Sequence, residues 1–263
     1  MKKTKSVLTL AGLLMAAMFF NQECQSQTQA PAGQQPAPQV AQAPAAAPAA
    51  PAAAPAGGAG GIKAVVKFSG TPPAMPKLKR EADPYCAKTP MNDQEIVVNG
   101  NGTLKNVAVR VIKGAAPAAT PPAEPVHIDQ NNCMYSPRVL GAVANQKLLI
   151  KNSDPILHNV HTYVGATTGF NQAQMKGSKD LEKTVAAGVT KFKCDVHPWM
   201  TGYVIGNDNP FICVTGENGE CLLNNVPAGT YTVEAWHEKF GTKTVDVTVA
   251  AGAATAEFTF AAQ

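Results

Sequence analysis

The sequence predicts an all-β protein in which an antiparallel β-sandwich is followed by a second, smaller β-sandwich. Short runs that alternate apolar and polar residues recur along residues 62–263, and Gly, Pro, Asn and Asp separate them. This pattern is typical of antiparallel sheets that bury one face. A helical period is weak throughout, and residues 172–181 are the one helical candidate.

The first 61 residues differ in character from the rest. Residues 1–26 resemble a secretory signal peptide, because three lysines precede an apolar run at 7–20 that is shorter than the roughly 20 residues a membrane span needs. We expect cleavage before Gln27, and only the alternative, an uncleaved anchor, would attach the chain to a membrane. Residues 27–61 are almost entirely Ala, Pro, Gln and Gly, which predicts a solvated linker.

Eleven strands are expected after the linker, at residues 64–68, 95–98, 106–112, 147–151, 159–164, 190–193, 203–205, 211–214, 230–236, 243–249 and 256–260. We assign 62–206 to the first domain, with 62–103 as an alternative N-terminal extension, and 207–263 to the second. Because five strands are few for a free-standing sandwich, residues 64–68 are a candidate to cross over and complete the second one.

Export places the chain in the periplasm or outside the cell, where cysteines pair. One cysteine leaves with the signal peptide, and four others are available for disulfides: Cys86, Cys133, Cys213 and Cys221. Cys86–Cys133 is the preferred pair. A hairpin turn at Asn218-Gly219 would place Cys213 and Cys221 on opposite faces, beyond the roughly 7 Å that a disulfide spans. The sequence therefore argues against that pair and leaves both cysteines unassigned.

A candidate metal site lies in the run Cys194-Asp195-Val196-His197-Pro198-Trp199-Met200, with His158 located 36 residues before Cys194. One thiolate, two imidazoles and a thioether are the ligands of a trigonal copper site with a long axial Met. Cys194 follows one expected strand, and the next begins just after Met200. His158 opens a third strand, so all four side chains are expected to reach one point.

The segment Cys194-x-x-His197-Pro198-Trp199-Met200-x-Gly202-x-Val204 resembles the amicyanin-type copper loop of the cupredoxin family. The resemblance implies one type 1 copper bound by His158, Cys194, His197 and an axial Met200. It also implies that electrons leave through the imidazole edge of His197 near the surface. Asp195 departs from the family pattern, which has a hydroxyl residue after the Cys. Four ligands on one copper leave no open position, so neither an enzyme nor a small-molecule substrate is expected.

The C-terminal segment has its own resemblance. Residues 211–215, Asn218-Gly219 and 225–231 resemble the carboxypeptidase regulatory-like, transthyretin-like β-sandwich family. The pattern consists of strands separated by a tight turn and a Pro-Gly turn. The resemblance implies a structural module that packs on or positions the first domain, or alternatively one that binds a partner or a glycan.

The predicted function is that of an exported blue copper protein that carries single electrons between redox partners such as a cytochrome or a dehydrogenase. Docking is expected at an apolar rim formed by Pro155, Ile156, Leu157, Pro198 and Trp199. One alternative is a copper-storage or copper-delivery protein. Another is a scaffold or adhesion module with a vestigial site, or with a zinc site completed by His161 or Asp195. No basic stripe indicates nucleic-acid binding.

Overall fold

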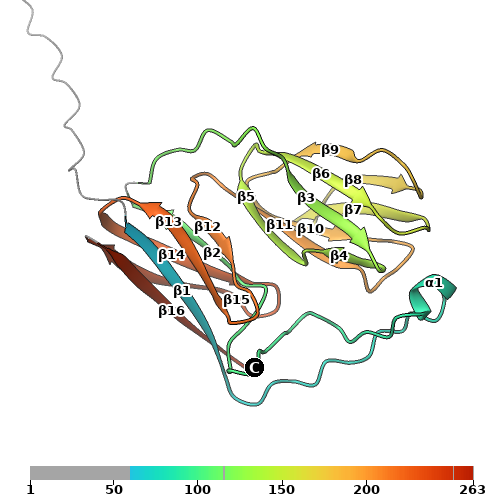
Figure 1. Cartoon of the computed structure of the whole chain (residues 1–263), viewed down its shortest axis with the longest axis horizontal. Coiled ribbons are helices and arrows are strands. Elements are labelled where there is room, and N and C mark those ends of the chain that lie inside the picture. Colours follow the sequence, from blue (N-terminus) through green and yellow to red (C-terminus); the bar gives the residue numbers. More distant parts are fainter. Residues whose placement is uncertain (1–59, 115, 251, 263) are drawn as a thin grey trace, which may run out of the picture. The chain divides into compact units, whose positions relative to one another are not determined.

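The computed structural model describes residues 60–114, 116–250 and 252–262, and this part of the chain is all-β, as predicted (Figure 1). The predicted signal peptide and most of the linker lie outside the described residues. The elements are β1 (Gly60–Ser69), α1 (Pro84–Ala87), β2 (Ala108–Lys113), β3 (Val126–Asn131), β4 (Met134–Ser136), β5 (Val139–Val143), β6 (Lys147–Asn152), β7 (His158–Val164), β8 (Thr167–Gln174), β9 (Leu181–Thr184), β10 (Gly188–Lys193), β11 (Thr201–Asn207), β12 (Ile212–Val214), β13 (Glu220–Val226), β14 (Gly229–His237), β15 (Gly241–Val249) and β16 (Ala253–Ala261). Within the described ranges, no helix has the length and apolar character needed to cross a membrane.

Two local predictions are wrong. Residues 172–181 form no helix, because they contain the end of β8, a turn and the start of β9. Residues 95–98 form no strand, since Val98 makes only an isolated pairing with Leu104. The other ten expected strands coincide with, or overlap, strands of the structure.

The first sandwich contains strands β3 to β11. One sheet has the strand order β5-β11-β10-β7-β8, and the other has the order β4-β3-β6-β9. Apolar side chains from both sheets fill the space between them, and they include Ile128, Ile150, Val160, Phe192 and Val204. Burying this face is the main favourable contribution to the stability of such a fold. Cys194 and Met200 belong to the same cluster.

The second sandwich takes strands from both ends of the described chain. Its sheets have the orders β13-β1-β16 and β12-β2-β14-β15. β1 runs parallel to β16 from Gly61↔Ala253 to Ser69↔Ala261, and it pairs with β13 on its other edge (Figure 1). This is the crossover proposed for residues 64–68. β1 and β2 pair with strands that follow residue 206, so the second sandwich also contains strands from residues 62–206. The division into two domains at residue 206 stays a prediction.

The disulfides include one confirmed pair and one correction. Cys86 and Cys133 are bonded, as preferred. Cys213 and Cys221 are bonded too, with their Cα atoms 5.9 Å apart, so the argument against this pair is wrong. It assumed that the flanking strands form one hairpin, whereas β12 pairs with β2 and β13 pairs with β1 in the facing sheet. The turn between them therefore crosses from one sheet to the other and brings the two sulfur atoms together.

The two sandwiches share a smaller apolar cluster. It combines Val139, Tyr203 and Ile205 of the first sandwich with Ala108 of the second, and Trp236 packs against it. The Tyr203 and Trp236 rings meet edge to face with their centroids 5.1 Å apart.

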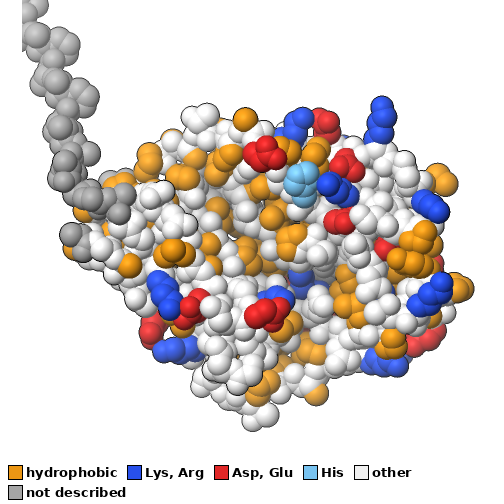
Figure 2. Space-filling model, viewed as in Figure 1, with side chains coloured by type: hydrophobic (Ala, Val, Ile, Leu, Met, Phe, Trp, Pro, Cys, Tyr) orange, Lys and Arg blue, Asp and Glu red, His pale blue; other side chains and the backbone are white. Residues whose placement is uncertain are grey.

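The surface carries charges of both signs. On the face presented in Figure 2, Lys and Arg side chains are interspersed with Asp and Glu side chains.

Candidate metal centre

Three side chains of the predicted site converge at one end of the first sandwich. His158 is the first residue of β7, Cys194 directly follows β10, and His197 lies in the loop that leads to β11. β10 is antiparallel to both neighbours, with Lys193 opposite His161 on β7 and opposite Thr201 on β11. The register of the sheet therefore fixes where Cys194 meets the other two ligands.

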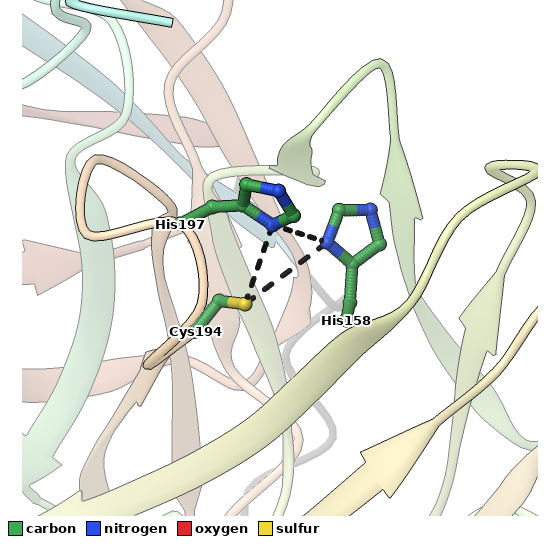
Figure 3. A group of neighbouring side chains, drawn as sticks. All are labelled: His158, Cys194 and His197. Carbon is green, nitrogen blue, oxygen red and sulfur yellow. Dashed lines mark hydrogen bonds between the residues drawn. The ribbon is translucent and has the colours of Figure 1, made fainter. Parts of the chain in front are cut away.

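The three candidate ligand atoms form a compact triangle (Figure 3). His158 Nδ1 and His197 Nδ1 are 2.9 Å apart, and Cys194 Sγ lies 4.0 Å from the first and 3.7 Å from the second. A point equidistant from the three atoms lies about 2.1 Å from each, close to the roughly 2.0–2.3 Å of metal–imidazole and metal–thiolate bonds. The donor set and its spacing thus fit a transition-metal ion.

Met200 is fully buried in the same core as Cys194. Its backbone N–H donates to His197 O at 2.9 Å, and its carbonyl accepts from Cys194 N at 3.4 Å. These bonds close the loop from residue 194 to residue 200 and hold the backbone of Met200 beside Cys194 and His197. An axial contact by its sulfur stays a prediction.

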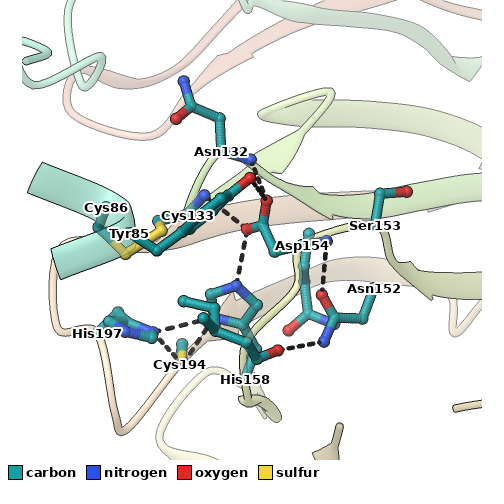
Figure 4. A network of polar contacts seen from close by, with 12 residues as sticks. Tyr85, Cys86, Asn132, Cys133, Asn152, Ser153, Asp154, His158, Cys194 and His197 are labelled. Carbon is teal, nitrogen blue, oxygen red and sulfur yellow. Dashed lines mark hydrogen bonds and ion pairs between the residues drawn. A yellow bond between two sulfur atoms is a disulfide. The ribbon is translucent and has the colours of Figure 1, made fainter. Parts of the chain in front are cut away.

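His158 is held from behind by a buried carboxylate. Its Nε2 lies 2.8 Å from Asp154 Oδ2, while its Nδ1 points to the other ligands (Figure 4). Asp154 also accepts hydrogen bonds from the backbone N–H groups of Asn132 and Cys133, both at 2.7 Å. Burial alone would raise the pKa of Asp154, but His158 and these two donors outweigh it and lower the pKa. Asp154 is therefore suited to accept from the outer nitrogen of a ligand histidine.

His158 and Cys194 favour the charged forms of each other. Burial lowers the pKa of His158, but Asp154 and the Cys194 sulfur raise it more, to about 9. Burial likewise raises the pKa of Cys194, and contacts with His158 and with the backbone N–H of Asn159 reverse this shift and lower it. The Asn159 N–H lies 3.5 Å from Sγ. The site thus stabilises the thiolate, which is the form that binds metal.

His197 is covered rather than exposed. Only 3% of its side chain is accessible, and Asp83, the residue that caps α1, places Oδ2 3.5 Å from its Nε2. Burial, together with the charge of His158, lowers the pKa of His197. His197 was expected near the surface, and a segment more than a hundred residues earlier in the chain lies over its outer nitrogen. Electron transfer through this imidazole edge stays a prediction.

His161 and Asp195, the alternative ligands for zinc, do not join the triangle. The ring of His161 lies 3.1 Å from the Asp195 carboxylate, and Asn159 and Asn171 donate to the same carboxylate at 3.0 and 2.9 Å. Asp195 N also donates to Asn159 Oδ1 at 2.6 Å. Asp195 thus ties the metal loop to β7 and β8.

Sequence analysis missed two residues of this centre. Asp154 lies four residues before His158, and this spacing is a signal that could have identified it. No sequence pattern around Asp83 indicates that it lies beside the metal centre, because no residue near it in the sequence belongs to the ligand triangle. Its place follows from the disulfide between Cys86 and Cys133.

No protein-family model matches the chain, and no curated protein matches it either. Among solved structures, an amicyanin from Paracoccus versutus is 24% identical, with 38% of this chain and 97% of that chain covered and a TM-score of 0.29. A purple cupredoxin from Nitrosopumilus maritimus is 23% identical, with 31% and 99% covered and a TM-score of 0.28. The overlap is about a third of this chain and nearly the whole of each of these two structures.

Proposed function

We propose that this protein is a single-copper electron carrier. In this proposal the copper is held by His158, Cys194 and His197, with Met200 as the axial ligand. The observation that carries it is the triangle of two imidazole nitrogens and one thiolate, whose atoms lie 2.9 to 4.0 Å from one another. A bound copper ion would supply one-electron redox chemistry.

The surroundings of the ligands suit this role. Thiolate and thioether favour the reduced ion, whereas imidazole suits both oxidation states. Asp154 orients His158, and the N–H of Asn159 faces the Cys194 sulfur. Because the ligands are buried and attached to paired strands, we infer that they move little when the charge of the site changes. Small movement favours fast electron transfer.

Apolar side chains near the site support a docking surface for a redox protein. Leu157, next to His158, is 43% exposed, and Val196, between Cys194 and His197, is 51% exposed. Pro155 and Pro198, two members of the expected rim, are exposed as well, while Trp199 is half-buried and donates to Cys133 O. We propose brief docking of a cytochrome or a dehydrogenase at this surface.

The remaining assignments are part of the same proposal. A signal peptide at residues 1–26 would export the protein to the periplasm or the cell exterior, and two disulfides are compatible with an oxidising compartment. Residues 27–61 would then be a linker. The second sandwich would be a carboxypeptidase regulatory-like module that supports the first.

The decisive experiment is an absorption spectrum of the purified protein after addition of Cu(II). We expect one copper per chain and an intense blue, green or violet colour from thiolate-to-copper charge transfer. Cys194→Ser should abolish the colour and His158→Ala should alter or remove it, whereas His127→Ala, a change at an exposed histidine of β3, should leave it unchanged. A colourless Cu(II) complex of the intact protein would contradict the proposal and favour storage of Cu(I) or a zinc site.

A further inference from the structure

The outer side of the metal centre is covered by residues 80–89, which include α1 and are called the cap segment here. Two contacts attach it to the β3–β4 turn, and a third joins it to the segment between β6 and β7. Cys86 is bonded to Cys133, the buried guanidinium of Arg80 donates to the carbonyls of Thr89 and Asn132, and Tyr85 donates to Asp154 at 3.1 Å. Arg80 therefore closes the cap segment on itself and joins it to the turn that carries Cys133.

The disulfide connects two matching arrangements, of which Figure 4 shows the one with Asp154 and His158. On one side, Cys133 N donates to Asp154 at 2.7 Å, and Asp154 faces Nε2 of His158 at 2.8 Å. On the other side, Cys86 N donates to Asp83 at 3.3 Å, and Asp83 faces Nε2 of His197 at 3.5 Å. Each half-cystine thus supports one carboxylate, and each carboxylate faces the outer nitrogen of one ligand imidazole.

We propose that Asp83 is a positioning residue for His197 and that the Cys86–Cys133 disulfide holds it in place. This inference rests on the proposed function, because it concerns the same metal centre. When a metal occupies Nδ1 of His197, the ring proton is on Nε2, and a carboxylate there fixes the orientation of the ring. His197 needs such support more than His158 does, because it lies in a loop rather than on a strand.

The alternative is that Asp83 serves only as the N-cap of α1. Its Oδ1 accepts from Tyr85 N at 2.8 Å and from Cys86 N at 3.3 Å, which is a normal capping arrangement. The two roles use different oxygens, since it is Oδ2 that faces His197. Asp83→Ser separates them, because serine is an equally good N-cap but is too short to approach the imidazole.

The experiment compares the purified protein with Asp83→Ser, with the double variant Cys86→Ser/Cys133→Ser and with Glu81→Ser as a matched control. Glu81 is an exposed acid of the same segment. The first readout is Cu(II) affinity by competition with a chelator. We expect Asp83→Ser and the double variant to lose roughly 10- to 100-fold, as is typical for partners behind a metal ligand, and Glu81→Ser to lose nothing. An unchanged affinity in Asp83→Ser would overturn the inference.

The second readout uses the metal-free protein and does not depend on the proposed function. Iodoacetamide alkylates Cys194 only when the reagent can pass the covering side chains, and peptide mass spectrometry measures the rate at this cysteine alone. We expect a several-fold faster reaction in Asp83→Ser than in Glu81→Ser, with the same thermal denaturation midpoint. Equal alkylation rates would contradict the positioning role. If the unmodified protein bound no Cu(II), the proposed function would fail, and the alkylation rates would still decide the role of Asp83.

Discussion

The Nε2 atom of His158 lies 2.8 Å from the Asp154 carboxylate, and solvent reaches at most 1% of either side chain. The contact is formed within one turn of chain, since Asp154 precedes the histidine by four residues. Asn152 stabilises this turn by donating to Ile156 O and by accepting from Asp154 N. A ligand histidine is thus oriented by a residue that the same turn supplies.

The first prediction concerns this contact. Asp154→Asn keeps the size of the side chain but replaces one acceptor oxygen with a donor, which cannot accept the ring N–H. We expect Cu(II) affinity to fall roughly 10- to 100-fold in a chelator competition. Asp129→Asn is the matched control, because Asp129 accepts from Ser153 at 2.7 Å and does not contact the ligands. Equal affinities in the two variants would show that Asp154 does not support His158.

The second prediction concerns the ion pair between Arg138 and Glu238, which joins the two sandwiches. Arg138 donates to both oxygens of Glu238, and the two side chains are only 6% and 4% exposed. Glu238→Gln removes the buried counter-charge and leaves only Asp93, 3.9 Å away and 36% exposed, beside the guanidinium. We therefore expect a loss of at most about 3–5 kcal/mol in urea unfolding. Arg110→Gln, which breaks the more exposed Arg110–Glu234 pair, should cost less.

The double variant Arg138→Met/Glu238→Leu sharpens this test, because it removes both charges. It should be less destabilised than Glu238→Gln, since replacing a buried pair by apolar residues leaves no isolated charge. A loss larger than that of the single variant would contradict this explanation.

The third prediction concerns pH and His237, a buried residue in the second sandwich. Its Nδ1 accepts from Lys239 N at 3.1 Å, and burial, with a smaller effect of Arg138, lowers its pKa to about 4. Because the unfolded chain binds this proton near pH 6.5, the contribution of neutral His237 is complete above pH 6.5 and is lost as the pH falls towards 4. The loss amounts to about 3 kcal/mol.

Urea unfolding at several pH values between 7.5 and 4 measures this effect. His237→Asn places an amide oxygen where Nδ1 accepts from Lys239 and removes the titrating group. The variant should therefore lose less stability with acid than the unmodified protein does, and all other groups titrate alike in the two proteins. Parallel stability curves would exclude His237 as the cause.

The candidate ligands could be proposed from the sequence because they are local. Cys194, His197 and Met200 lie within seven residues, and His158 opens a strand whose alternation is clear. Asp83 could not be predicted in this way, since its position depends on a disulfide and on the path of residues 70–107, which form few regular elements. His197 was expected near the surface from the loop alone, and the loop does not reveal that Asp83 lies against its outer nitrogen.

The errors in the fold have physical causes of the same kind. β8 was missed because it exposes most of its side chains and so lacks the alternation of a half-buried strand. The Cys213–Cys221 pair was rejected because two strands joined by a tight turn normally pair with each other. Here they belong to facing sheets, because β1 pairs with β13 in place of β12. A sequence segment of about ten residues carries no information on long-range strand pairing of this kind.

The last prediction compares two carboxylates close to the metal centre. Removing a negative charge near copper destabilises Cu(II) relative to Cu(I), so it raises the reduction potential. Asp195 is 51% exposed on its side chain and is paired with His161, and water and salt screen its charge. Asp154 is buried and contacts His158 directly, so its charge is screened much less. We therefore expect Asp154→Asn to raise the reduction potential more than Asp195→Asn does. The shift in Asp195→Asn should be at most tens of millivolts, and about 59 mV corresponds to a tenfold change in the one-electron equilibrium.

Voltammetry of both variants at one pH and ionic strength measures which of the two shifts is larger. A larger shift in Asp195→Asn, or a lowered potential in Asp154→Asn, would contradict the assignment of Asp154 as the charge that tunes the site.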